Sequence, residues 1–256
     1  MKTWLSNEYA AVSEGRRCLP RSVIPFAWVM LAAAGCASAP DPASAVSGAT
    51  TFEEAGLVDI RTLVPDISEQ VRYAGSENFM GVPAEGYGAA RCYLTTQAAQ
   101  ALQRVEQSVR PQGFRLRVFD CYRPARAVRH FVRWAADLQD QRNKARYYPN
   151  LDKTRLLGDY IAPVSGHSRD ATLDLTLLDC RAPDGRCVPL DMGTEFDFFD
   201  PSANTGSPMI TPLQKENRQR LLHAMAQQGF KNYPQEWWHY TLSSHGSRML
   251  YDIPIQ

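Results

Sequence analysis

The sequence predicts one α+β domain, in which helices flank a mainly antiparallel sheet. Three observations predict it: segments with helical periodicity alternate with short strands, turn residues separate them, and no repeat of fixed period is present. The chain has 256 residues, of which 44% are hydrophobic, so it is long enough to bury one core. Its formal net charge of +1 gives no reason to expect nucleic acid as a partner.

The first half of the domain should contain a helix, a strand and a second helix. The first helix is expected from Leu94 to Arg110 and is stopped by Gly113, and alternation then predicts a strand from Phe114 to Phe119. A second helix, opened by proline, should run from Ala125 to Leu138. The residues expected to face the core from these helices are Leu102, Val105, Val109, Val128, Phe131 and Ala135.

The second half should contain a strand, a helix and a closing strand. The leucines of 173–177 alternate with Asp174 and Thr176, which therefore belong to the opposite face of a strand. Pro212 opens a third helix that Gly229 ends, and the closing strand is expected from Trp237 to Leu242. The third helix should turn four side chains inward: Leu213, Leu221, Leu222 and Met225.

The N-terminal segment predicts export. After several basic residues, an apolar run of about twelve residues extends from Val23 to Ala34, which is too short to span a bilayer. It ends in Ala-Ala-Gly-Cys, which is similar to a lipoprotein cleavage box with Cys36 as the lipidated residue. We expect a signal peptide over 1–35, a linker over 36–51 and the folded domain over 52–256, in a periplasmic protein anchored to the outer membrane. An ordinary cleaved signal with an incidental cysteine is the alternative.

The folded domain contains four cysteines, an even number that suggests two disulfides in an exported chain. Cys180 and Cys187 flank a short loop with proline and glycine, so a local bridge is expected. Cys92 would then pair with Cys121 by elimination. The alternative is four free or metal-binding cysteines, although no CxxC spacing supports a zinc knuckle.

Two segments about seventy residues apart could form a metal site on the sheet. His167 lies in a turn rich in serine and glycine that leads into the strand of Asp174, and His239 lies in the closing strand. Two imidazoles and one carboxylate suit Zn²⁺, and catalytic zinc sites have three protein ligands with a fourth position open to water. Singly, each residue is more typical of a surface or structural position, so the hypothesis depends on their combination.

Two further residues could complete a hydrolase. Glu236, three positions before His239, could act as a general base on water, provided that a bend near Trp237 brings both to one side. Arg123 follows a strand and precedes Pro124, and its guanidinium could stabilise an oxyanion. For Glu236 the structural alternative is a polar residue that flanks an aromatic core strand. For Arg123 it is an ion pair with Asp120.

In several motifs the chain resembles the D-alanyl-D-alanine dipeptidases of the VanX type, zinc peptidases related to D-alanyl-D-alanine carboxypeptidases. The resemblance extends from about Val71 to Tyr251. The motifs that carry it include Glu85-Gly86-Tyr87, Asp120-Cys121-Tyr122-Arg123-Pro124, Ser165-Gly166-His167-Ser168-Arg169, Asp174-Leu175-Thr176-Leu177, Phe196-Asp197-Phe198 and Glu236-Trp237-Trp238-His239-Tyr240.

The resemblance implies one Zn²⁺ per chain, bound by His167, Asp174 and His239, with Glu236 as the base and Arg123 at the transition state. It also places Ser165 and Tyr87 at a pocket for a small D-amino-acid dipeptide, most simply D-Ala-D-Ala; a loop aromatic packed on the core is the alternative for Tyr87. The chain departs from the family at Asp170, where the family has glycine. Two other functions remain open: a peptidase for longer wall peptides, or a wall-peptide-binding lipoprotein without catalysis.

Overall fold

The computed structural model describes residues 45–169, 171–243 and 249–256. The expected signal peptide, Cys36 and Asp170 lie outside the described residues, and what was predicted for them stays a prediction. Residues 40–256 group into one compact unit. Within the described ranges, no helix is both long and apolar enough to cross a bilayer.

The described residues form an α+β fold, as predicted. The α-helices are α1 (Thr96–Val109), α2 (Ala125–Ala136), α3 (Lys144–Tyr147), α4 (Leu156–Asp159) and α5 (Pro212–Ala226). The strands are β1 (Leu57–Asp59), β2 (Ser68–Glu69), β3 (Tyr93–Thr95), β4 (Phe114–Asp120), β5 (Thr172–Asp179), β6 (Val188–Pro189), β7 (Phe230–Asn232) and β8 (His239–Leu242).

The main sheet is mixed, which corrects the expectation of a mainly antiparallel sheet. Its strand order is β2-β4-β5-β8-β7, with β6 paired to β5, and β1 pairs with β3 in a separate two-stranded sheet. The β2–β4 pair is parallel, whereas β5 is antiparallel to β4, β6 and β8. A parallel pair needs a long crossover, and the chain between β2 and β4 supplies one that includes α1.

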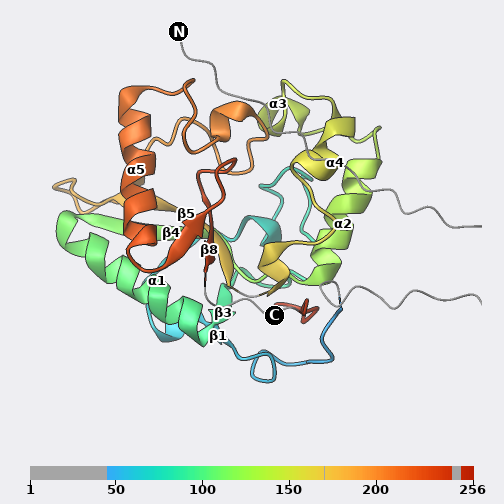
Figure 1. The fold of residues 1–256 in the computed structure, drawn as a ribbon, viewed down its shortest axis with the longest axis horizontal. Helices are drawn as coiled ribbons and strands as arrows, with labels where there is room; N and C mark the ends of the chain where they lie inside the picture. The colour runs from blue at the N-terminus through green and yellow to red at the C-terminus, as the bar shows by residue number, and fades with distance from the viewer. Residues whose placement is uncertain (1–44, 170, 244–248) are drawn as a thin grey trace, which may run out of the picture. The chain divides into compact units, whose positions relative to one another are not determined.

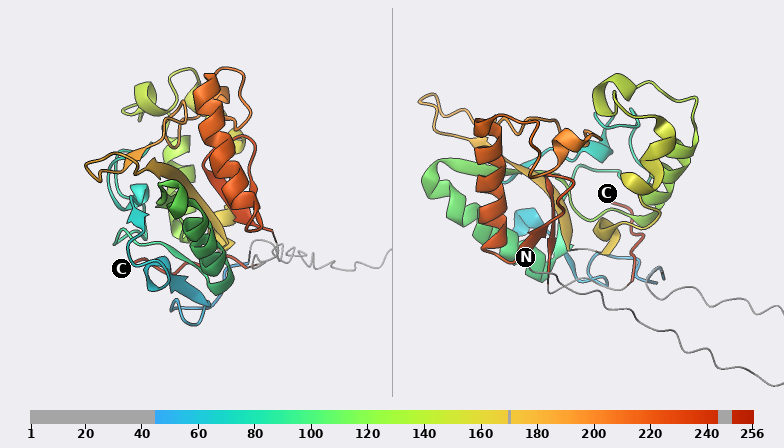
Figure 2. Two further views of the ribbon diagram at one scale, coloured as in Figure 1. Left: turned by 90° about the vertical axis from the view of Figure 1, so that its left-hand side faces the viewer. Right: turned by 45° about the horizontal axis from the view of Figure 1, so that its top comes forward.

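The two faces of the main sheet have different roles. Helices α1 and α5 lie on one side of the sheet, and α2, α3 and α4 lie on the other (Figures 1 and 2). Leu173, Leu175 and Leu177 of β5 are fully buried, and so are Asp174 and Thr176, which point to the opposite side. β5 is therefore covered on both faces, and polar side chains are enclosed on one of them.

Helices α2 and α5 start where the sequence predicts, and α1 starts at Thr96, two residues after the predicted Leu94. Thr95 caps α1 by accepting a hydrogen bond from the N–H of Ala98, and Thr211 and Gln214 form a capping box at α5. The inward faces predicted for the first two helices are confirmed, because all six of their apolar side chains are buried.

Two expectations about the second half are wrong. Leu213 is 63% exposed, because the inner face of α5 is partly polar: Arg218 is fully buried there and donates to the backbone carbonyls of Met192, Asn204 and Ser202. The closing strand begins at His239 rather than at Trp237.

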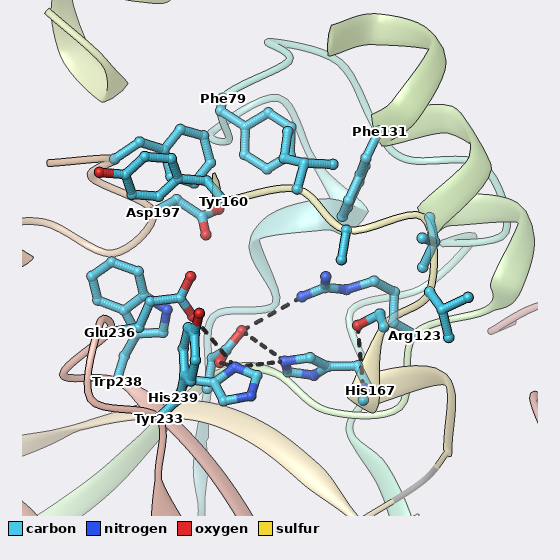
Figure 3. Close-up of a pocket in the computed structure, with 18 of the residues that line it drawn as sticks. Phe79, Arg123, Phe131, Tyr160, His167, Asp197, Tyr233, Glu236, Trp238 and His239 are labelled. Carbon is cyan, nitrogen blue, oxygen red and sulfur yellow. Dashed lines mark hydrogen bonds and ion pairs between the residues drawn. The ribbon is translucent and has the colours of Figure 1, made fainter. Parts of the chain in front are cut away.

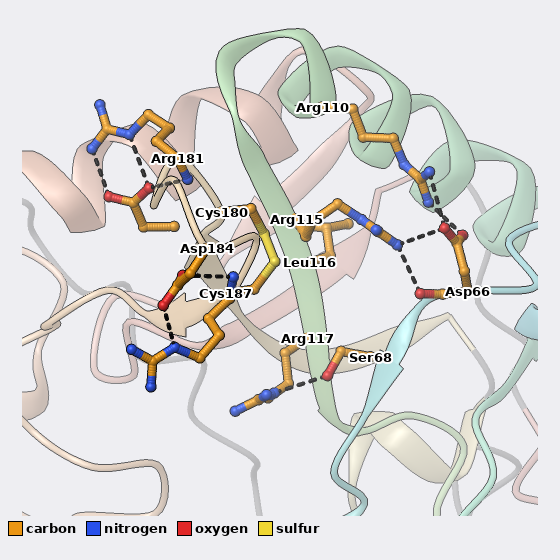
Figure 4. Close-up of a disulfide and its surroundings, with 12 residues drawn as sticks. Asp66, Ser68, Arg110, Arg115, Leu116, Arg117, Cys180, Arg181, Asp184 and Cys187 are labelled. Carbon is orange, nitrogen blue, oxygen red and sulfur yellow. Dashed lines mark hydrogen bonds and ion pairs between the residues drawn. A yellow bond between two sulfur atoms is a disulfide. The ribbon is translucent and has the colours of Figure 1, made fainter.

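The described cysteines form two disulfides. Cys92 pairs with Cys121, which joins the residue just before β3 to the residue just after β4. Cys180 pairs with Cys187 and closes an exposed loop between β5 and β6 (Figure 4).

Candidate active site

Three side chains that lie far apart in the sequence meet beside the main sheet. His167 comes from a 3₁₀ turn (Gly166–Arg169), Asp174 from β5 and His239 from the start of β8. Asp174 and His239 are directly paired in the β5–β8 ladder, so the backbone register itself brings them together. One potential ligand atom from each of the three residues lies within 4.8 Å of the others.

The ring of His167 is oriented by the backbone. Its Nδ1–H donates to the carbonyl oxygen of Cys121 over 2.8 Å, because a carbonyl can only accept. Nε2 therefore faces the other two side chains: it lies 3.3 Å from Oδ2 of Asp174 and 3.2 Å from Nδ1 of His239. Such a second hydrogen bond is what fixes the tautomer of a histidine that ligates a metal.

The electrostatics of this group favour a cation. Burial opposes ionisation of Asp174, yet His167 and His239 outweigh it and hold the pKa of Asp174 well below its usual range. Burial also opposes protonation of His239, but Asp174 raises the pKa of that imidazole above its usual value. Among the described residues, Oδ1 of Asp174 accepts no hydrogen bond of good geometry, although Nδ1 of His239 is 3.0 Å away. A buried carboxylate oxygen without a hydrogen bond is suited to contact a positively charged group such as a metal ion.

Glu236 faces the same point without belonging to the three-residue set (Figure 3). It lies in a turn before β8, where its N–H donates to the carbonyl of Tyr233 and the N–H of Trp237 donates to that of Ala203. The irregularity expected near Trp237 is therefore present. Oε2 of Glu236 is 3.5 Å from Nδ1 of His239, and burial raises the pKa of this carboxyl to about 7, with Asp174 adding to the shift and His239 opposing it.

Arg123 occupies the other side of the pocket. Burial opposes its charge, but Asp120 raises the pKa of the guanidinium well above its usual value. Its Nη2 lies 2.8 Å from Oδ2 of Asp120 and 3.6 Å from Oδ2 of Asp174. The guanidinium also packs over the rings of Tyr73 and Phe131, at 4.9 and 5.1 Å. Ion pairing and aromatic packing together hold it beside Asp174 and the two histidines.

The two residues expected at a dipeptide pocket have different environments. Ser165 lines the pocket, and its Oγ accepts the N–H of His167 over 3.2 Å. Tyr87 is buried and is not among the lining residues; its hydroxyl donates to Oδ1 of Asp120 over 2.6 Å. Tyr87 thus supports the partner of Arg123, and substrate contact by Tyr87 is not what this geometry favours.

Asp197 is a pocket residue to which the sequence analysis gave no role, although its motif was recognised. It has a left-handed backbone (φ 61°), is buried, and accepts a hydrogen bond from the hydroxyl of Tyr73 over 2.8 Å. Burial, and then the charge of Asp174, raise the pKa of this carboxyl well above its usual value. Non-glycine residues rarely adopt this backbone, and such strain often marks a functional position.

The cavity around these groups measures about 250 Å³. In Figure 3 the imidazoles of His167 and His239 and the guanidinium of Arg123 lie below the rings of Phe79, Tyr160 and Phe131, and Asp197 lies among the upper residues. The aromatic side chains that line it are Tyr73, Phe79, Phe131, Tyr160, Phe199, Tyr233 and Trp238. Polar groups converge in a mostly apolar cavity, which is the usual form of a site for a small molecule.

Comparison with known proteins identifies the same family throughout. Residues 53–255 match a family model described as D-ala-D-ala dipeptidase. A D-alanyl-D-alanine dipeptidase of Enterococcus faecium is 36% identical over 205 residues, which are 79% of this chain and 100% of that protein. One from Streptomyces coelicolor is 39% identical (75% and 95%), and one from Escherichia coli is 30% identical (76% and 88%).

Proposed function

The chain belongs to the D-Ala-D-Ala dipeptidase family, and from this premise we propose that it hydrolyses D-alanyl-D-alanine with a single Zn²⁺ and a glutamate base. The observation that carries the proposal is the meeting of His167, Asp174 and His239 beside Glu236 and Arg123 in one cavity. The donor set supports zinc, because two imidazoles and one carboxylate form a common catalytic zinc set. A zinc ion held there would polarise the peptide carbonyl and make a bound water ionisable near neutral pH.

The protein's own groups account for proton transfer and charge stabilisation. Glu236 takes the proton of the attacking water and later gives it to the leaving amine, a role suited to a carboxyl with a pKa of about 7. Arg123 keeps its charge in the pocket and stabilises the negative charge that develops on the carbonyl oxygen. The carboxyl of Asp197 lines the same cavity, and the positive charge of a substrate ammonium beside it would favour the ionised carboxylate, which accepts hydrogen bonds from that ammonium.

The dimensions of the cavity favour a dipeptide over a longer wall peptide. Drug-sized ligands occupy pockets of roughly 300–1,000 Å³, and this cavity of about 250 Å³ falls below that range. A substrate with few atoms beyond the scissile bond fits such a space.

The test is a D-alanine release assay on the purified chain, with D-Ala-D-Ala and a wall pentapeptide supplied in parallel, each with zinc and with a chelator. Metal-dependent release from the dipeptide alone is expected. Release from the pentapeptide alone would show that the protein is a carboxypeptidase. Bound metal without release from either peptide would indicate a binding protein.

We also propose that the domain works outside the cytoplasm, attached to a membrane through Cys36. The export signal in the sequence supports this, and so do the two disulfides, which persist in oxidising compartments. In cells that express the full chain, Cys36→Ser should move the protein from the membrane pellet to the soluble fraction. An unchanged distribution would argue against the lipid anchor.

A further inference from the structure

A second cavity, of about 600 Å³, opens beside the main sheet on the same face as the candidate active site. Arg117 of β4 pairs with Thr176 of β5, and Asp120 of β4 pairs with Asp174, which is two residues before Thr176 on β5. Cross-strand partners point to the same side of a sheet, as do residues two apart on one strand. Arg117 and Asp120 lie three apart, and the register shift between Val118 and Asp120 lets both face this side.

The wall between the two cavities is aromatic. Trp237 lines the second cavity, whereas the next residue, Trp238, lines the first. Phe196 stacks on Phe119 and packs edge-on against Trp238, at 4.9 and 5.5 Å between ring centroids. The second cavity is therefore a separate site, with its own lining and its own charges.

Two guanidiniums line this cavity, Arg117 without a carboxylate in ion-pair distance among the described residues and Arg72 with one at the protein surface. The Nε–H of Arg117 donates to the hydroxyl of Ser68 over 2.9 Å (Figure 4). Arg72 approaches only the exposed Glu77, at 3.4 Å, and its buried Nε has no partner in the described part of the chain. Burial lowers the pKa of Arg117, and the charge of Arg72 lowers it further. Two like charges thus share this cavity, and the charged form of Arg117 is destabilised there.

The carboxylates that line the cavity are already engaged. Glu195 forms an ion pair with Arg146 at 2.9 Å. Asp191 accepts hydrogen bonds from the N–H of Gly193 and from the side-chain amide of Gln214, over 2.8 and 2.9 Å. The lining residues include three arginines (Arg72, Arg117 and Arg146) and two carboxylates (Asp191 and Glu195), so their net charge is +1.

A buried hydroxyl provides a second, independent indication of a ligand. Thr176 lines the cavity, is 2% exposed, and its Oγ1 has no hydrogen-bond partner among the described residues. A buried polar atom without a hydrogen bond loses its interaction with water and gains nothing in return, so such atoms normally have a partner. The missing partner here must be able to accept a hydrogen bond while it lies beside two cations.

We propose that this cavity binds a small oxyanion, a carboxylate or a phosphate, between Arg72 and Arg117. The Thr176 hydroxyl donates to one oxygen of the anion, and the guanidiniums donate to the others. Phe119, Trp237 and Met192 line the same cavity and would contact an apolar body attached to the anion. The inference concerns a site that the proposed peptidase chemistry does not use.

The test is calorimetric titration of the full chain with inorganic phosphate and, separately, with butyrate, at constant ionic strength. Binding of at least one anion per chain is expected, and the preferred probe shows whether the site suits phosphate or a carboxylate with an apolar tail. Each titration is repeated with a chelator, because phosphate held by an active-site metal would then be lost and phosphate held by arginine would not. Dipeptide turnover measured on the same preparation keeps this test separate from the proposed function.

Three variants locate the bound anion. Arg117→Gln and Arg72→Gln should each weaken binding by about tenfold or more, since a hydrogen bond to a charged group contributes roughly 1.5–3 kcal/mol. Thr176→Val, which keeps the shape and removes the hydroxyl, should weaken binding less. Arg186→Gln is the matched control, because it removes the same charge from a side chain that is 83% exposed and outside this cavity. No binding of either anion, or equal affinity in the wild type and both arginine variants, would overturn the proposal.

Discussion

Replacing Glu236 with Gln should stabilise the metal-free protein at alkaline pH and abolish turnover at the same time. The carboxyl is buried, and burial raises its pKa from 4.5 to about 7. The folded state therefore binds this proton more tightly than the unfolded state. That contribution to stability is complete below pH 4.5 and is lost as the pH rises through 7. The Gln side chain does not ionise, so the stability of the variant does not fall in this pH range as that of the wild type does.

The size of the effect follows from the shift. A difference of about 2.5 pKa units, at 1.36 kcal/mol per unit, corresponds to about 3 kcal/mol. The unfolding free energy of Glu236→Gln, relative to that of the wild type, should thus increase by up to about 3 kcal/mol between pH 4 and pH 8. Loss of a general base should lower kcat by about 10²- to 10⁴-fold, while metal content stays near one per chain because Glu236 is outside the ligand set.

Urea unfolding with a chelator, at several pH values, measures the unfolding free energy. D-alanine release measures kcat, and metal analysis of the same samples measures the metal content. Glu216→Gln is the control, since Glu216 is exposed on α5 and pairs only with Arg220 in the structure. A stability difference that does not change with pH would refute the burial argument. A kcat of Glu236→Gln within about tenfold of the wild type would refute the general-base assignment, and lost turnover with lost metal would make Glu236 a ligand instead.

Three other perturbations have expected outcomes. Asp174→Asn should lose the metal in equilibrium dialysis, because the amide lacks the negative charge of the carboxylate that lies between His167 and His239. Metal retained at one ion per chain would contradict the proposed ligands. Arg123→Lys should lower kcat by about 10²- to 10³-fold with less effect on KM. An unchanged kcat would show that Arg123 has only a structural role, in its ion pair with Asp120. Removing the Cys92–Cys121 disulfide by double serine replacement should cost about 3–4 kcal/mol of unfolding free energy for a loop of this length. The same change should reduce turnover, since the Cys121 carbonyl orients His167, and full activity would show that the disulfide is not needed for that orientation.

The ligand set could be proposed from sequence because strand periodicity carries the necessary information. Alternation with buried leucines assigns Asp174 to the opposite face of β5, and the cross-strand pairing of Asp174 with His239 places both on that face. Glu236 needed one more inference, because an odd offset on a strand would have pointed it away from His239. The turn before β8 resolves this, and proline with a local backbone bend was its only signal.

Other parts of the site depend on contacts that no local pattern encodes. Asp197 receives its hydrogen bond from Tyr73, 124 residues earlier in the chain, and Tyr87 reaches Asp120 across 33 residues. The parallel pairing of β2 could not be predicted either, because a two-residue strand has no periodicity to detect. Arg117 follows the alternation of a half-solvated strand, and only the folded chain shows that it faces a cavity.

The pairing of Asp174 with His239 also determines when in the life of the chain a metal can enter. The strand of His239 is the last in the sequence, yet it lies between β5 and β7 inside the sheet. A chain still being synthesised therefore lacks a complete set of candidate ligands, and a metal ion cannot act as a template for its early folding. An ion held by these three residues would be bound only after β8 has joined the sheet.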